Sequence, residues 1–160
     1  PGQSLTNDPE KPLPFEQAPV HTELAPAIDD LLVRLCEPEI FHTIVNALRE
    51  GLPVGEMAEQ ILFEGFAQGQ YNPDLLLLLV EPTMYILIAL ADMADVEPRI
   101  DDEDDDPDPE EEITQLEKVI ALAKEKIVPS QVPSPIKSKV EQLTKNIKPK
   151  EQSLLSKEEA

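Results

Sequence analysis

The chain has 160 residues with 17 prolines and six aromatic side chains, so we expect one modest domain whose core is aliphatic rather than aromatic. Its net charge is −20; the acidic excess lies in residues 1–112, while residues 113–160 carry a small basic excess. An acidic surface repels phosphate backbones, which argues against direct nucleic-acid binding. Cys36 is the single cysteine, so these residues hold no intrachain disulfide, and no charged start followed by an apolar stretch predicts a signal peptide.

Residues 1–25 are predicted to form an extended, proline-rich arm. Each proline fixes φ, removes a backbone donor and biases the preceding residue toward extended geometry. Such a segment loses little entropy when it docks, so we expect its apolar side chains to bind a partner. These candidate partner-binding residues are Leu5, Leu13, Phe15 and Val20. A terminus without a binding role is the alternative interpretation.

Residues 26–96 are predicted to form a helical body. In residues 27–36, apolar side chains recur at helical spacing and make one stripe, and residues 39–50 and 52–69 show the same pattern. Pro38 suits the first turn of the second helix, and Gly51 suits its end. The body therefore begins with three amphipathic helices.

The segment 75–94 is apolar nearly all round. Pro82 lies within it, so we expect either one helix kinked at Pro82 or two helices broken there. Glu81 and the short length argue against a membrane span. The segment is predicted to be the centre of a small bundle or to lie against another protein.

Residues 97–112 are interpreted as an acidic, solvated linker, because mutual repulsion keeps so many carboxylates apart. A calcium loop is the alternative interpretation, since four carboxylates fall at ligand spacing: Asp101, Glu103, Asp105 and Glu112. Asp106 stands where such a loop needs glycine, and Pro107 stiffens the chain. The linker interpretation is therefore preferred, and no metal is expected.

Residues 113–148 hold two heptad-like helices, followed by a flexible tail over 149–160. Their apolar side chains recur at spacings of three and four, but each helix is too short to persist in water without a surface to pack on. We expect these side chains to bind a neighbouring chain or another copy, and pairing with each other or with the body stays open. The candidates are Ile113, Leu116, Ile120, Ile127, Ile136, Val140, Leu143 and Ile147.

The sequence carries no catalytic signature. Cys36 and His42 are separated by a predicted helix break, and nothing nearby supplies a third group for nucleophilic catalysis. Glu81 is a lone acid within an apolar run, either buried or facing solvent at the break. There is no glycine-rich phosphate loop and no zinc-type spacing of cysteine and histidine. We therefore expect a protein that is not an enzyme and has no cofactor.

Two stretches, PGQSLTNDPEKPLPFEQ and GLPVGEMAEQILFEGFAQGQYNPDLLLLLVEP, resemble a family of small virion structural proteins of T4-like tailed phages, notably those of marine cyanobacteria. The resemblance covers about residues 1–96. It implies a helical protein with a proline-rich arm, located in the virion after assembly in the host cytoplasm. The acidic linker and the two heptad segments have no counterpart in that pattern.

The leading hypothesis is a capsid cement or decoration protein that binds neighbouring subunits through its arm and helical body, with the major capsid protein as the expected partner. A neck or tail structural protein and an internal scaffold or assembly factor are the alternatives. A soluble regulator that mimics DNA through its carboxylates is a further alternative, disfavoured because the prolines leave the acidic run without a rigid surface. The expected partners are other virion proteins, with no direct nucleic acid and no membrane.

Overall fold

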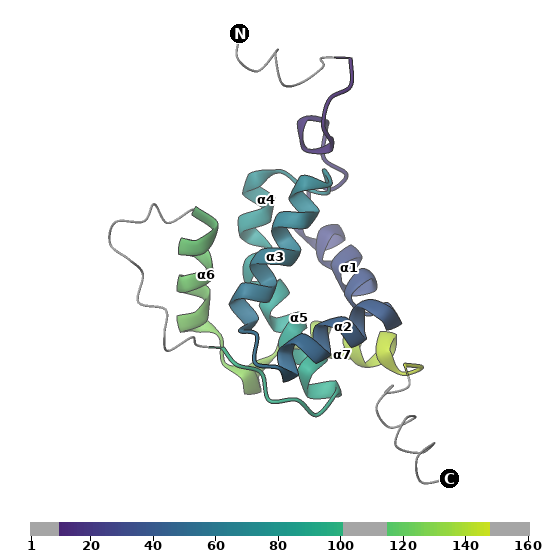
Figure 1. Ribbon diagram of the computed structural model, residues 1–160, viewed down its shortest axis with the longest axis vertical. Coiled ribbons are helices and arrows are strands. Elements are labelled where there is room, and N and C mark those ends of the chain that lie inside the picture. The colour runs from purple at the N-terminus through teal and green to yellow at the C-terminus, as the bar shows by residue number, and fades with distance from the viewer. Residues whose placement is uncertain (1–9, 101–114, 148–160) are drawn as a thin grey trace.

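The computed structural model describes residues 10–100 and 115–147, and it is mainly helical, as the sequence predicts (Figure 1). Leu5, Ile113, the candidate calcium ligands and the tail 149–160 lie outside the described residues. The described part contains the 3₁₀ turns η2 (Pro14–Glu16) and η3 (Pro129–Gln131) and these helices: α1 (Leu24–Leu35), α2 (Pro38–Arg49), α3 (Val54–Ala67), α4 (Pro73–Leu78), α5 (Val80–Met93), α6 (Gln115–Lys126) and α7 (Ser134–Thr144).

The three amphipathic helices form as their patterns predict. α2 begins at Pro38 and its end is followed by Gly51, whose φ of 102° is a left-handed conformation that glycine adopts without steric cost. α1 begins at Leu24, two residues before the predicted boundary, since Pro26 fits within a first helical turn. The buried faces of α1 and α2 comprise Ala27, Leu31, Leu32, Leu35, Phe41, Ile44, Val45 and Leu48.

α5 is the central helix of the bundle. α1, α2, α3, α4, α6 and α7 all pack against it, and every residue from Thr83 to Ala91 is buried. A helix that is apolar nearly all round is stable only when it is covered on all sides, which these six neighbours achieve. The expectation of a central apolar helix is therefore confirmed.

The break in the apolar run differs from the predicted one. Two helices form, as one of the alternatives held, but they meet at Leu79 rather than at Pro82. Pro82 lies in the first turn of α5, where a helix leaves N–H groups without intrahelical partners and proline therefore costs little. The side chain of Asn72 caps α4 by accepting a hydrogen bond from the Leu75 N–H at 2.8 Å.

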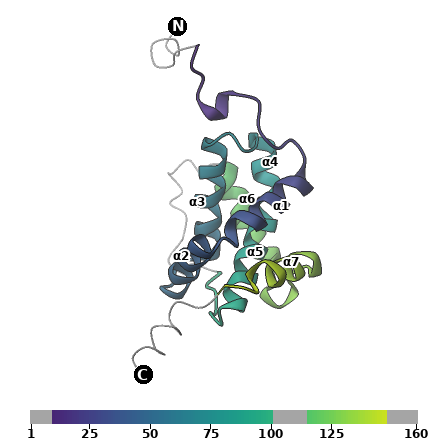
Figure 2. The same cartoon turned by 90° about the vertical axis from the view of Figure 1, so that its right-hand side faces the viewer.

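The C-terminal helices pack on the body of the same chain. α6 lies against α3, α4 and α5, and α7 lies against α1 and α5; α6 and α1 are on opposite sides of the bundle (Figures 1 and 2). Gly55 of α3 permits the close approach of α6, because a Cβ at this position would lie only 2.9 Å from a methyl carbon of Ile120. The open question of what these helices pair with is thereby answered: each packs chiefly on the body.

This packing changes the interpretation of the heptad residues. The side chains predicted to bind a neighbouring chain are instead buried in the chain's own core at Leu116, Ile120, Ile127, Ile136 and Val140. Spacing identifies an apolar face but not the surface that covers it, and here the body supplies that surface. Leu143 lies at the exposed edge of α7, and Ile147 lies half-buried beyond its end.

Candidate functional site

The arm is docked along its later half onto the turn between α3 and α4. The Val20 N–H donates to the Gly69 carbonyl at 3.1 Å, and the His21 N–H donates to the Gln70 carbonyl at 2.8 Å. Gly69 has a φ of 77°, and a Cβ there would collide with the Pro14 carbonyl, so only glycine allows the arm this close. The sequence therefore builds a short docking site for residues 12–21 at the end of α3.

Apolar side chains of the arm remain exposed after this docking. The Phe15 ring stacks on Phe66 of α3 with centroids 5.9 Å apart, yet Phe15 is still 44% exposed. Leu13 is 41% and Val20 67% exposed. Three of the four predicted partner-binding residues of the arm thus present apolar surface to solvent.

An apolar groove of about 290 Å³ adjoins this aromatic pair. It lies between α3, α4 and the start of α6, and Phe66 links it to the arm because this ring both contacts Phe15 and lines the groove. The lining residues are Glu59, Phe63, Phe66, Pro73, Leu76, Leu77, Gln115 and Leu116. Arm and groove together form one apolar surface, which we call the arm-groove face.

Phe63 is the most prominent side chain of the groove. It is 61% exposed, although an aromatic ring buries readily where a neighbour is available. The helical pattern of residues 52–69 places it off the inward stripe, and sequence analysis did not select it. A large aromatic residue on the polar side of an amphipathic helix is the signal that would have identified it.

The two helices α3 and α4 that border the groove are acidic, and Glu59 is the one carboxylate among the lining residues. No lysine, arginine or histidine occurs between Arg49 and Arg99, so α3 and α4 carry only carboxylates as charged groups. These are Glu56, Glu59, Glu64 and Asp74. Gln115 and Leu116 of α6 close the third side of the groove, next to Glu117 and Lys118.

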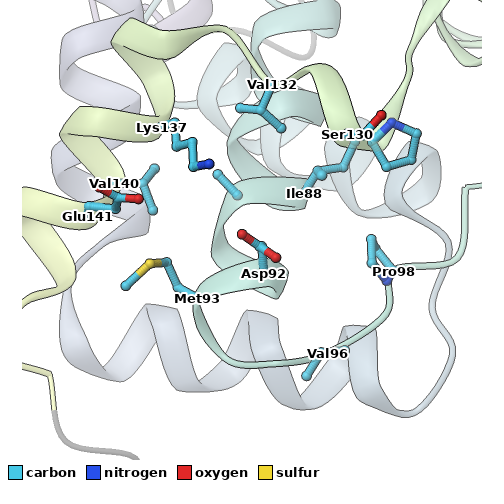
Figure 3. A pocket seen from close by; sticks show the side chains of 12 residues that line it. Ile88, Asp92, Met93, Val96, Pro98, Ser130, Val132, Lys137, Val140 and Glu141 are labelled. Carbon is cyan, nitrogen blue, oxygen red and sulfur yellow. The ribbon is translucent and has the colours of Figure 1, made fainter.

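A second, more polar pocket of about 320 Å³ lies at the seam between α5 and α7 (Figure 3). Ile88 and Val140 form part of its apolar lining, and the carboxylate of Asp92 points into it with Lys137 and Glu141 on the α7 side. All three charged side chains are exposed, so water reaches each of them. The pocket marks where α7 meets the end of α5, and its mixed charges select no ligand class.

The remaining candidate groups do not assemble into a reactive site. Cys36 is buried at the end of α1, where desolvation raises the pKa of its thiol from 9.0 to about 11, which keeps it protonated near neutral pH. The ring of His42 packs edge-on against Phe41, with ring centroids 5.6 Å apart. Glu81 is exposed. Within residues 10–100 and 115–147, no three histidine, cysteine or carboxylate side chains are placed to hold a metal ion.

Side-chain contacts of Tyr71 and His21 lie at the base of the arm. The Tyr71 hydroxyl donates to the Leu62 carbonyl at 2.9 Å, and burial raises the pKa of this phenol. His21 Nε2 lies 3.5 Å from the Asp30 carboxylate, which also faces Arg34 at 3.9 Å. The arm therefore joins the body through a small polar cluster on α1 as well as through the turn after α3.

Comparison with known proteins finds no matching family model, no similar curated protein and no similar solved structure. Among the helices that the structure describes, none combines the length and the apolar character that crossing a membrane requires.

Proposed function

We propose that this chain is a non-enzymatic structural component of a tailed-phage virion, a capsid cement or decoration protein that binds neighbouring subunits through the arm-groove face. The observation that carries the proposal is the exposed apolar surface that joins Phe15 of the arm to Phe63 and Phe66 of the groove. Contiguous apolar surface on a folded protein marks an interaction site. The resemblance of residues 1–96 to small virion proteins of T4-like phages is the reason for proposing that this binding takes place on a phage particle.

The division of the molecule into a rigid bundle and a lightly held arm supports this role. Two backbone hydrogen bonds, one half-exposed aromatic stack, the contact of Pro14 with Gly69 and the contact of His21 with Asp30 hold the arm. Its release therefore costs less than unfolding of the bundle. A released arm reaches a neighbouring subunit while the body stays folded. The major capsid protein is the proposed partner, and a neck or tail protein is the second candidate for the same surface.

Cross-linking mass spectrometry on purified particles tests the proposal. Lys11 lies in the arm and Lys118 lies beside the groove, whereas Lys137 and Lys139 lie on α7 at the seam with the body. We expect Lys11 and Lys118 to link to the major capsid protein, and Lys137 and Lys139 to link mainly within the chain. Links only to neck or tail proteins would move the protein to the connector region. Absence of the chain from mature particles would contradict a virion role and favour a scaffold that leaves before maturation.

Deletion of residues 1–20 gives a second test of the arm. This variant keeps every helix of the bundle, so its far-UV circular dichroism spectrum should keep the helical signal. Particle occupancy should fall, because the apolar side chains at Leu13, Phe15 and Val20 are removed. Unchanged occupancy would show that the arm does not tether the protein.

A further inference from the structure

The groove has the size of an anchor site rather than of a ligand pocket. Its volume of about 290 Å³ is at the lower end of small-molecule pockets, and two phenylalanines and three leucines supply most of its lining. Protein interfaces concentrate binding energy in a few large side chains that fill such concavities. The groove is therefore matched to one or two apolar side chains projecting from a partner segment.

The charges around the groove restrict the partner further. α3 and α4 carry four carboxylates and no basic side chain, and Glu59 lines the groove itself. On α6, Glu117 and Lys118 follow Leu116 and carry no net charge together. A partner segment with acidic flanks would be repelled there, whereas lysine or arginine beside the apolar anchors would be attracted. Complementarity of charge thus adds a basic flank to the apolar anchor.

We propose that the groove between α3, α4 and α6 binds an amphipathic segment of another protein, in which apolar anchor side chains are flanked by lysine or arginine. The anchors enter beside Phe63 and Leu77, and a basic flank faces Glu59, the carboxylate that lines the groove. This inference rests on the proposed interaction role and names the partner's chemistry.

A second copy of the chain fits this groove poorly. The outer surface of residues 10–100 is acidic, so two copies repel each other on approach. The two helices with a small basic excess, α6 and α7, already use their apolar faces, since Leu116, Ile120, Ile136 and Val140 are buried against the body. A basic segment of a different protein is the occupant that the charges select.

Fluorescence anisotropy with two labelled helical peptides tests the inference. One peptide is built of leucine and lysine with all leucines on one face, and the other has glutamate in place of lysine. We expect the purified full chain to bind the leucine–lysine peptide and not the leucine–glutamate one. Phe63→Ser should weaken binding by about tenfold, because it removes an anchor contact at the centre of the groove. Since Phe63 is 61% exposed, the variant should keep the thermal stability of the parent chain.

Leu122→Ser is the matched control, because Leu122 is 58% exposed on α6 but does not line the groove. We expect this variant to bind the leucine–lysine peptide as the parent chain does. Equal losses in the two variants, or no loss with Phe63→Ser, would mean that diffuse charge alone holds the peptide and would overturn the proposal. So would a chain that forms dimers broken by Phe63→Ser and binds neither peptide, since a second copy would then occupy the groove.

The peptide experiment is separable from the virion proposal. A chain that binds the leucine–lysine peptide through Phe63 but is missing from purified particles would keep the inference and lose the virion role. A chain that is bound to particles but whose peptide binding is unchanged by Phe63→Ser would keep the virion role and lose the inference.

Discussion

The sequence predicts that the arm and the two C-terminal helices both bind other chains, but their apolar side chains differ in burial. The heptad side chains of α6 and α7 are buried against α3 and α5, whereas Leu13, Phe15 and Val20 of the arm stay exposed even where the arm is docked. An apolar pattern shows that a segment needs a covering surface. Only the folded chain shows whether its own body already provides that surface.

The largest expected effect concerns the C-terminal helices. Ile120→Ala removes a side chain that is 5% exposed between α6 and α3, so the free energy of unfolding should fall by about 2–5 kcal/mol. Urea denaturation measures this loss. Leu122→Ala on the same helix is the control and should change stability by no more than about 0.5 kcal/mol. Equal small effects would mean that α6 does not belong to the body.

A glycine pair tests how the arm is held. Gly69→Ala and Gly51→Ala each place a Cβ at positive φ, which costs about 1–2 kcal/mol. Only at Gly69 does the new Cβ also meet the Pro14 carbonyl, while nothing lies within 4 Å of it at Gly51. Hydrogen exchange of the Val20 and His21 amides should therefore accelerate in Gly69→Ala alone. The same acceleration in both variants would refute the docking contact.

The buried thiol predicts a loss of stability at alkaline pH. The pKa of Cys36 is about 11 in the folded chain and 9.0 when unperturbed, so the unfolded state loses its proton first as the pH rises. Burial of the protonated thiol therefore lowers the free energy of unfolding only above about pH 9, and the loss should reach about 1.4 kcal/mol at pH 10. Urea denaturation at pH 8 and pH 10, compared with Cys36→Ala, isolates this difference. An identical pH dependence in both chains would contradict burial of the thiol.

The smallest effect should come from the ion pair between α7 and α1. Lys139 Nζ lies 2.6 Å from the Asp29 carboxylate, but both side chains are about half exposed, so their coupling should be no more than about 1 kcal/mol. A double-mutant cycle with Lys139→Ala and Asp29→Ala measures it. A much larger coupling would mean that charge, rather than the apolar seam at Val140, holds α7 in place.

Much of the fold could be predicted because helical periodicity depends on local spacing. The stripe at Ile28, Leu31 and Leu35, the start of α2 at Pro38 and the central apolar helix all follow from that rule. The helix break moved to Leu79 because proline is tolerated in a first turn, so Pro82 marks a boundary only to within a few residues.

The candidate site was harder to predict because it depends on contacts between distant segments. The docking of Phe15 on Phe66 joins residues about fifty positions apart, and the groove closes only when α6 packs beside α4. Phe63 carried a local signal, an aromatic residue off the inward stripe, that sequence analysis did not use. The burial of Val140 had no such signal, since a heptad face packs equally well on a partner chain or on the chain's own body.

Hydrogen–deuterium exchange of the chain, free and bound to purified particles, tests the central claim most directly. The arm-groove face should gain protection on binding, in peptides that cover residues 10–21 and Phe63, while α7 should exchange as in the free chain because Ile136 and Val140 are already buried. Protection gained by α7 with none at the arm or at Phe63 would contradict the account, and would return the binding role to the heptad helices.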